Sequence, residues 1–438
     1  MIGPSSDLLR FTLAAVLVSP AAVVLPPLLP VVVSLFVALG AAMTWEYFQL
    51  RRMPPLRLSR RFPGRVFVGR SAQVEVVVTN PGSTPAVVEI VDEVAAQLRA
   101  GDPAFAEVEI PAGATRSLPY EIVPAARGNH VLGPLVALRR SPRGLLERRE
   151  TGGGDVIRAF PDTARFVRAQ PFDVRRWFAQ LGVRAAPRRG QGSELESMRD
   201  YVPGDDTRRI VWGASARRGR PVVRLDRHER NHTVWIVIDT SRLMGGAIGA
   251  QTKLDHAIDA ALALACGALG SQDRVGMLAF DASVHTRMGP RRHRADLGQF
   301  VELLQPLQVK LVEPSYRTLA RMLIDQLGQR ALIVVLSDFG AADEESLIAS
   351  LALIAKRHRV VLAGLRDPAF AALDPIDPSA DDGMGIYRRI VLADLMDERE
   401  KIVGRLRRAG VDTLDVPPQQ INARLLHRYL EIRYGAER

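Results

Sequence analysis

The chain has 438 residues, of which 47% are apolar and 24% are charged. This length exceeds what one hydrophobic core serves and predicts two or three domains, while the composition excludes a disordered chain. The formal net charge of +11 comes from 59 Lys and Arg residues against 48 Asp and Glu residues, and four of the 59 are lysine. Such a strong preference for arginine over lysine is typical of genome composition and does not by itself indicate nucleic-acid binding. A lone cysteine, Cys266, excludes an internal disulfide.

An uncharged stretch near the N-terminus predicts a membrane hairpin. Residues 11–45 are 35 consecutive residues without a charge, and a single helix of that length would rise about 52 Å against a hydrocarbon core of about 30 Å. The prolines within 26–30 interrupt the stretch and leave 9–25 and 28–47 as two spans. Residues 1–53 are therefore expected to form a transmembrane helical hairpin.

The flanks of the second span predict its sidedness. Trp45, Tyr47 and Phe48 form an interfacial aromatic belt, and arginines at 51, 52, 57, 60, 61 and 65 follow. The positive-inside rule then places both termini and the soluble domains in the cytoplasm. The alternative is a signal peptide ending near residues 19–22, which a single n-region charge at Arg10 disfavours.

Residues 54–161 have the pattern of an all-β domain. Turn signals such as Asn80-Pro81-Gly82 separate short alternating runs, a spacing typical of an immunoglobulin-like antiparallel sandwich. No cluster of catalytic residue types occurs in this segment, so we interpret it as a spacer or docking module. Strands are expected at 66–68, 72–79, 86–91, 107–110, 116–123 and 130–138.

Residues 162–232 are expected to be a connector that carries a polar box. A tight turn precedes a helical signature there, with two aspartates placed to cap the helix, arginines along it and a tryptophan as its buried apolar anchor. The box residues are Asp205, Asp206, Arg208, Arg209, Trp212 and Arg217.

Charge in the connector is concentrated but mixed. Residues 184–230 contain twelve arginines and seven acids, a net charge of +5, with Tyr201 and Trp212 as the aromatics. A phosphate-binding surface would account for the arginines. Because acids alternate with arginines and no aromatic array accompanies them, an ion-paired scaffold is favoured over a nucleic-acid interface.

The connector ends in a metalloprotease-like pattern. His228-Glu229-Arg230-Asn231-His232 reads H-E-x-x-H, whose zinc chemistry needs a helix so that both imidazoles reach one metal. The runs on both sides are β-like, so a zinc site is disfavoured.

Residues 233–438 have the pattern of an α/β domain in which helices cover a parallel sheet. This pattern predicts a Rossmann-like architecture. Strands are expected at 233–238, 274–280, 284–288, 331–336, 359–365 and 411–416, the third of them antiparallel. Helices are expected at 254–269, 295–304, 316–327, 344–356, 392–409 and 419–432.

Three motifs together carry a family resemblance. The box G-x-E-x-x-x-x-R-x-Y-x-x-G-D-D-x-R-x-I-x-W begins at Gly192, S-A-R-R follows at Ser215, and a strand then ends in D-T-S at Asp239. The chain resembles bacterial membrane proteins with the domain of unknown function fifty-eight. The resemblance implies a von Willebrand factor A-like C-terminal domain, a location at the inner membrane, and a partner that is a MoxR-type AAA+ ATPase.

The von Willebrand A resemblance also implies a metal-ion-dependent adhesion site. Such a site holds Mg²⁺ through D-x-S-x-S, a threonine and a distant aspartate; Asp239, Ser241 and Asp338 match it, whereas Leu243 replaces the second serine. With oxygen ligands missing, we expect a polar docking surface that binds Mg²⁺ weakly at most. Arg242 is then the expected donor to the unpaired carboxylates. The alternative is that both aspartates cap the loops that follow them.

Catalytic motifs are not found. The glycines before Lys253 do not make a phosphate-binding loop, since that loop needs glycine directly before the lysine, and no G-x-S-x-G elbow occurs. Asp281, Ser283 and His285 place triad residue types in a plain hairpin. We therefore expect a non-enzymatic membrane-anchored adaptor that works with a MoxR-type ATPase in assembly or maturation of envelope or multisubunit targets. The alternatives are a membrane tether for nucleic acid and a zinc hydrolase using His228 and His232.

Overall fold

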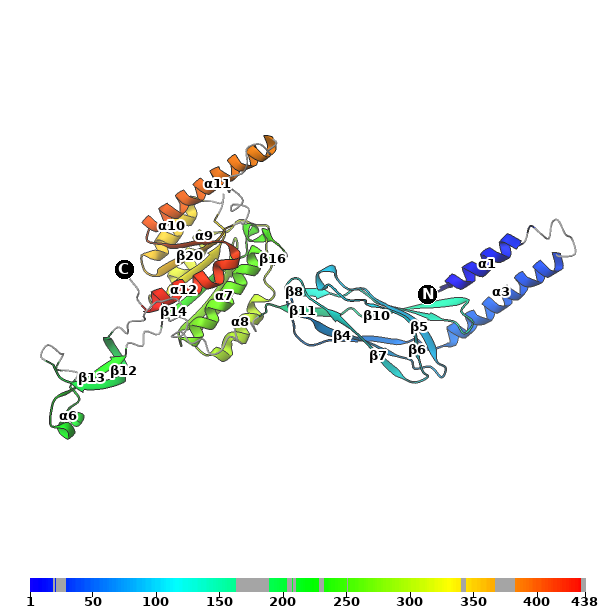
Figure 1. The fold of residues 1–438 in the computed structure, drawn as a ribbon, viewed down its shortest axis with the longest axis horizontal. Coiled ribbons are helices and arrows are strands. Elements are labelled where there is room, and N and C mark those ends of the chain that lie inside the picture. Colours follow the sequence, from blue (N-terminus) through cyan, green and yellow to red (C-terminus); the bar gives the residue numbers. More distant parts are fainter. Residues whose placement is uncertain are drawn as a thin grey trace. The chain divides into compact units, whose positions relative to one another are not determined.

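The computed structural model describes residues 1–18, 20, 29–162, 189–202, 207, 210–227, 232–249, 251–339, 344–366 and 383–434. The chain divides into two compact units, Met1–Asp162 and Thr163–Arg438 (Figure 1). The first unit contains two N-terminal helices and an all-β body. The second contains a two-stranded ribbon and an α/β body.

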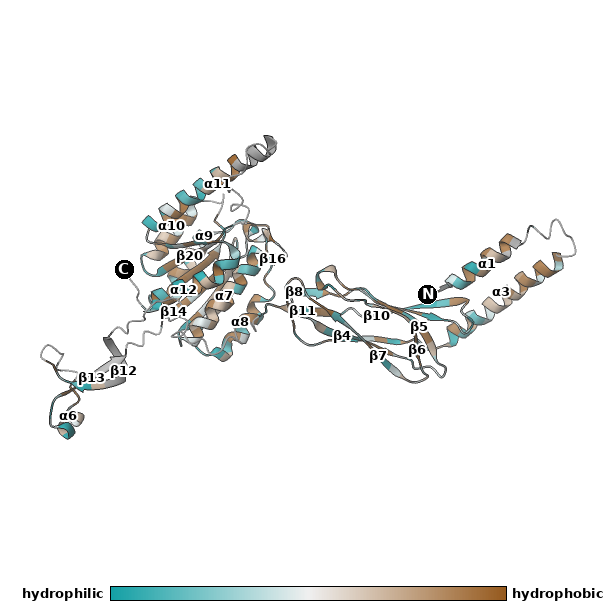
Figure 2. Cartoon of the chain, in the orientation of Figure 1, coloured by the Kyte–Doolittle hydropathy of each residue, from teal (hydrophilic) through white to brown (hydrophobic). Residues whose placement is uncertain are grey.

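Helix α3, Leu29–Arg52, is the one helix in the described part of the chain that is long and apolar enough to cross a membrane. Its 24 residues rise about 36 Å, more than the hydrocarbon core requires. Apolar residues dominate its surface (Figure 2). Helix α1, Ser6–Val18, covers part of the first expected span; the rest of that span lies largely outside the described residues.

The all-β body contains three sheets. The largest has the order β1-β10-β9-β5-β6, and the others have the orders β2-β4-β7 and β3-β11-β8. All pairings are antiparallel except that of β11 with β3. The bounds are β1 Ile2–Pro4, β2 Arg57–Arg61, β3 Val66–Phe67, β4 Ala72–Thr79, β5 Ala86–Asp92, β6 Ala104–Ile110, β7 Thr115–Ile122, β8 Gly128–Val131, β9 Leu135–Arg140, β10 Leu146–Gly152 and β11 Val156–Phe160.

The sheets of this body share one hydrophobic core. Alternate residues of each strand point inward, so Val76 of β4, Ile90 of β5 and Ile157 of β11 join the same buried cluster. A charged pair lies among them. Arg60 Nε donates to both carboxylate oxygens of Asp92, at 3.0 and 3.1 Å, and the hydroxyl of Tyr120 donates to the same carboxylate at 2.7 Å.

The structure corrects the expected strands in two ways. The strand expected at 130–138 is two strands, β8 and β9, because Gly133 and Pro134 interrupt it and proline cannot donate to a ladder. Strands β1, β2, β10 and β11 were not expected. The sequences of β2 and β10 are rich in arginine, which hides their alternation.

The ribbon of the second unit pairs β12, Arg189–Asp200, with β13, Val222–Arg227, in antiparallel register. Helix α6, Trp212–Arg218, lies between them in the sequence and is followed by Gly219 in a left-handed conformation at φ 65°. The backbone amide of Val211 bonds to the carbonyl of Val222, which ties the start of α6 to the ribbon.

The α/β body is built on a six-stranded sheet with the order β18-β17-β14-β19-β20-β21. Neighbours are parallel except β18 against β17, as expected. The strands are β14 Thr233–Asp239, β17 Arg274–Phe280, β18 Val284–Arg291, β19 Leu332–Ser337, β20 Arg359–Leu365 and β21 Asp412–Val416. The helices are α7 Lys253–Gly270, α8 Leu297–Leu304, α9 Tyr316–Gln326, α10 Glu344–Ala355, α11 Gly383–Arg408 and α12 Ile421–Tyr434.

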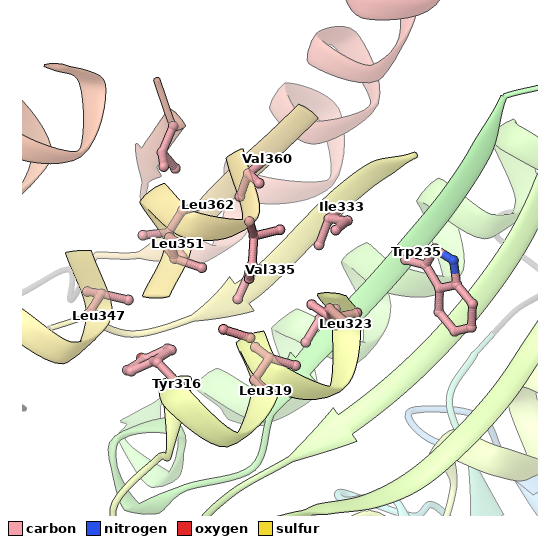
Figure 3. Close-up of a cluster of buried hydrophobic side chains, with 14 of the residues drawn as sticks. Trp235, Tyr316, Leu319, Leu323, Ile333, Val335, Leu347, Leu351, Val360 and Leu362 are labelled. Carbon is pink, nitrogen blue, oxygen red and sulfur yellow. The ribbon is translucent and has the colours of Figure 1, made fainter. Parts of the chain in front are cut away.

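Helices α9, α10 and α11 pack on one face of this sheet. Leu319 of α9, Leu351 of α10 and Leu406 of α11 belong to one buried cluster with alternate strand residues such as Trp235 and Val335. Figure 3 shows several of these side chains converging from helices and strands. Strands β14, β19 and β20 are buried on both faces, which explains their nearly continuous apolar sequences.

The buried pair in the all-β body gives a stability prediction. Replacing Arg60 with Met leaves the fully buried carboxylate of Asp92 without its cation, and we expect a loss of about 3–5 kcal/mol. Hydrogen exchange of the full-length chain measures this locally, in peptides from β4 and β7, with β14 of the other unit as the internal control. The double variant Arg60→Met with Asp92→Leu should be less destabilised than Arg60→Met alone. Unchanged exchange in the single variant would contradict the role of the pair.

Candidate functional site

Two of the predicted metal-site residues lie at the carboxyl edge of the sheet in the α/β body. Asp239 ends β14, and Asp338 directly follows β19. These strands are parallel neighbours in register from Val234 with Leu332 to Ile238 with Leu336, so both aspartates arrive at the same edge. Both are buried, with 0% and 5% of their surface exposed. Both residues therefore lie at the edge where the resemblance predicts a metal-ion-dependent adhesion site.

Asp239 is held by hydrogen-bond donors on both carboxylate oxygens. The Ser337 hydroxyl donates to Oδ2 at 2.6 Å, and the backbone amide of Ser241 donates to Oδ1 at 2.8 Å. The Tyr316 hydroxyl bonds to Ser337 Oγ at 2.8 Å and extends this network to α9. Burial raises the pKa of Asp239 to about 6, although the bonds from Ser337 and Ser241 lower it, and the neighbouring Asp338 raises it further.

Asp338 is held by two cations. Lys253 Nζ lies 2.6 Å from its Oδ2, and Arg399 Nη1 lies 2.8 Å from its Oδ1. Lys253 is the first residue of α7, and its own side chain is 9% exposed. Arg399 of α11 also bonds to the carboxylate of Asp415 on β21, at 2.9 Å from Nη2. The site is thus a compact ion-paired network.

An aromatic contact fixes the orientation of Arg399. Its guanidinium carbon lies 4.3 Å from the centroid of the Phe339 ring, within range of a cation–π interaction. Gly364 of β20 leaves room for this stack, since a Cβ there would lie 2.3 Å from a carbon of the Phe339 ring and 3.0 Å from Arg399 Nη2. A side chain at residue 364 would therefore displace the ring or the guanidinium.

The prediction that Arg242 donates to these carboxylates was wrong. Arg242 pairs with Glu313 on the surface and not with either aspartate. Arg242 lies in the 3₁₀ turn Arg242–Gly245, where its side chain is 47% exposed. Lys253 is the residue that sequence reasoning missed. The signal in the sequence is a lysine at the first position of a helix whose residues are mostly apolar.

The site residues do not fit Mg²⁺ in this arrangement. Magnesium needs nearly complete octahedral oxygen coordination, but both oxygens of Asp338 contact cations and both oxygens of Asp239 accept hydrogen bonds. Leu243 supplies no oxygen at the position of the second serine. Elsewhere in the described ranges no group of three His, Cys, Asp or Glu side chains could hold a metal ion.

A loop beside this network presents an exposed apolar side chain. The backbone amide of Lys310 donates to the carbonyl of Thr240, and that of Arg242 donates to the carbonyl of Val312, so the loop is tied to the end of β14. Leu311 lies between these two attachments and is 90% exposed. The edge therefore combines a rigid polar base with a projecting leucine.

The triad residue types near this edge form a hairpin turn, as expected. Ser283 donates its backbone amide to Asp281 Oδ1 at 3.0 Å. His285 Nε2 lies 3.0 Å from Thr240 Oγ1 and 3.3 Å from Asp281 Oδ2. Burial and the charge of Lys310 lower the pKa of His285. No hydrogen bond joins the described side chains of His285 and Ser283, so the geometry is not that of a nucleophile with its base.

The connector box is described only in part. Asp205, Asp206, Arg208 and Arg209 lie outside the described residues. Arg217 donates from Nε to the carbonyl of Gly213 within α6. Trp212 is 71% exposed, so the prediction that it is a buried anchor was wrong. Trp212 begins α6, and the short helix leaves its indole facing solvent.

The H-E-x-x-H pattern lies in a β context. Strand β13 ends at Arg227 and β14 begins at Thr233, and His232 between them is not helical. Residues 228–231 lie outside the described residues.

The network around Asp338 predicts an unequal effect of two lysine replacements. Lys253→Met leaves a buried carboxylate oxygen without its cation, so we expect a loss of about 1–3 kcal/mol. Lys310→Met is the matched control, because Lys310 pairs with Asp281 from a side chain that is 52% exposed, and its loss should be below about 1 kcal/mol. Hydrogen exchange of β19 in the full-length chain measures both. Equal effects would show that burial does not strengthen the Lys253 pair.

The raised pKa of Asp239 predicts a pH dependence. The folded protein holds this proton more tightly than the unfolded chain, whose Asp titrates near 3.8. Stability should therefore fall as pH rises from about 4 to about 6, by roughly 3 kcal/mol, and then level off. Asp239→Asn should remove that fall, which hydrogen exchange of β14 in the full-length chain would measure across this pH range. Parallel pH profiles for the two proteins would contradict the assignment.

Comparisons with known proteins agree with the motif-based resemblance over part of the chain. Residues 197–379 match the family model described as "Protein of unknown function DUF58". Uncharacterized proteins of Mycobacterium tuberculosis (strain ATCC 25618 / H37Rv) and Mycobacterium bovis (strain ATCC BAA-935 / AF2122/97) are each 31% identical over 183 residues. The matched region is 41% of this chain and 56% of each relative, so the chain spans about half the length of these curated relatives.

Two solved structures are similar at a lower level. An aerotolerance-related membrane protein from Bacteroides fragilis is 20% identical, with a TM-score of 0.32, and the conserved hypothetical protein BatB from Bacteroides thetaiotaomicron is 15% identical, with the same TM-score. Each match covers 46% of this chain and 98% of the other. Likenesses at this level say nothing of activity. The family model is the most specific of these findings: residues 197–379 match the DUF58 family, whose function is unknown, and this range includes most of the box and the D-T-S strand end.

Proposed function

We propose that this protein is a membrane-anchored adaptor that binds a partner protein at the carboxyl edge of its α/β body. The observation that carries the proposal is the ion-paired network under this edge. It joins α7 and α11 to the ends of β19 and β21 and so gives the edge a rigid base. The partner is a MoxR-type AAA+ ATPase, as the family resemblance implies. The pair would act in assembly or maturation of envelope or multisubunit targets.

The membrane anchor is supported by α3. Its length suits a bilayer, and most of its apolar side chains are exposed to the surroundings instead of packing in a protein core. Arg51 and Arg52 end the helix, and both are exposed. By the positive-inside rule, this end and the two soluble bodies would lie on the cytoplasmic side of the inner membrane.

Two features support the docking edge: its ion-paired base is rigid, and an apolar side chain is exposed beside that base. A von Willebrand A-like domain binds its partners at this edge of the sheet. Here Lys253 and Arg399 neutralise Asp338 from within, so docking would not need a divalent cation. Leu311 projects from the edge, and an exposed leucine on an ordered loop is suited to fill an apolar pocket on a partner.

Binding measurements on reconstituted protein test this proposal. Full-length chain in vesicles is mixed with a purified MoxR-type ATPase, and the ATPase that floats with the vesicles is measured. Leu311→Asp should weaken binding by about tenfold or more, as for an apolar anchor residue. Leu353→Asp is the matched control, because Leu353 is also an exposed leucine, at 47%, but lies on α10.

The outcomes separate the parts of the proposal. Equal binding by wild type and Leu311→Asp would contradict the docking edge. Binding that EDTA abolishes would contradict cation independence. Wild-type protein that does not float with the vesicles would contradict the membrane anchor.

A further inference from the structure

The tip of the hairpin between β9 and β10, residues 141–145, is attached to α3 through one buried carboxylate. Glu46 of α3 is 1% exposed. Its Oε2 accepts from the Ser141 hydroxyl and from the Leu145 amide, the latter at 3.2 Å, and its Oε1 accepts from the Arg143 amide at 3.0 Å. Burying a carboxylate is costly unless it is hydrogen-bonded. These bonds therefore fix the tip on the helix.

The start of α1 holds the other side of the tip. The Ser5 amide donates to the Leu145 carbonyl at 3.0 Å, and the Ser5 hydroxyl donates to the Gly144 carbonyl. Leu8 of α1 and Leu50 of α3 pack with Leu145 and Leu146 in a separate buried cluster. The tip is thus clamped between the ends of both N-terminal helices.

This clamp places the tip at the level of the interfacial aromatic belt. Trp45, Tyr47 and Phe48 flank Glu46 in the sequence and are 62%, 40% and 52% exposed. Aromatic residues of this kind lie at the headgroup level of a bilayer. The backbone amide of Arg143 bonds to Glu46, so the backbone of Arg143 lies at that level as well.

Positive charge at this level is not neutralised by the part of the chain that the structure describes. Arg51, Arg52 and Arg143 are exposed, and their side chains form no ion pair with another described residue. The nearby Asp7 pairs with Arg10 at 3.4 Å. Three exposed guanidinium groups are therefore available to a ligand near the aromatic belt.

We propose that Arg51, Arg52 and Arg143 form a binding surface for the phosphate of an anionic phospholipid. This inference rests on the proposed membrane anchor. Guanidinium groups bind phosphate through paired hydrogen bonds, and basic residues beside a membrane helix are attracted to anionic lipid. Because Arg143 belongs to the all-β body, the bound lipid links that body to the bilayer surface. Glu46 is the positioning residue of this surface.

Lipid retention by the full-length chain tests the proposal. The protein is purified in detergent and titrated with phosphatidylglycerol or with phosphatidylcholine of the same chain length, and bound lipid is counted by native mass spectrometry. We expect selective retention of phosphatidylglycerol. Arg143→Gln should weaken that retention by about fivefold. Arg116→Gln, which removes the same charge from an exposed residue of β7, should leave it unchanged.

A second variant separates positioning from charge. Glu46→Ala keeps all three arginines but releases the tip, so phosphatidylglycerol retention should fall as it does in Arg143→Gln. A far-ultraviolet circular dichroism melt identifies any unfolding, and Glu107→Ala is the control for loss of a glutamate in the same body.

Two results would overturn the inference. Equal retention of both lipids by wild type would show that the surface does not select anionic headgroups. Displacement of bound lipid by millimolar inorganic phosphate would show an anion site that does not recognise a lipid. Failure of the membrane anchor is a different result: wild-type protein would then leave the membrane fraction in alkaline carbonate, whatever its lipid preference.

Discussion

A carboxylate enclosed between two cations is the constraint on which the α/β body depends. Asp338 is 5% exposed, and a buried carboxylate without a charged partner is very costly. Lys253 and Arg399 supply the compensation from α7 and α11, and Arg399 continues to Asp415 on β21. One ion-paired network therefore ties two helices and two strands to the same edge of the sheet.

The same physical solution occurs in the first unit with different donors. Glu46 is buried and satisfied by a hydroxyl and two backbone amides, and these bonds join a membrane-type helix to the all-β body. A third buried carboxylate, that of Asp92, pairs with Arg60 inside that body. In each case a charged group that would be unfavourable alone specifies which elements contact each other, because other arrangements would leave it unpaired.

The sequence predicts the α/β body closely, because its central strands β14, β17, β19 and β20 are apolar runs that are buried along nearly their whole length. The strands expected at 274–280 and 359–365 coincide with β17 and β20. The all-β body is harder to predict. Strand β2 reads RLSRR and has its buried Arg60 pointing inward, so the alternation of apolar residues that identifies a strand is missing.

The site could be predicted only in part. Asp239 and Asp338 end or follow strands, so their meeting at one edge follows from sheet topology. The role of Lys253 does not, because its contact with Asp338 joins residues 85 positions apart and depends on how α7 packs. The prediction for Trp212 was wrong for a different reason. An aromatic residue in a motif suggests burial, but a seven-residue helix has little surface with which to cover it.

Lys253 and Arg399 occupy the oxygens of Asp338 that a metal would need if this edge held the adhesion site that we propose it has lost. Isothermal titration of Mg²⁺ into the full-length protein in detergent tests this claim most directly. The account predicts no saturable heat, because every carboxylate oxygen of Asp239 and Asp338 is already engaged. Saturable binding in the micromolar range that Asp239→Ala abolishes would contradict it.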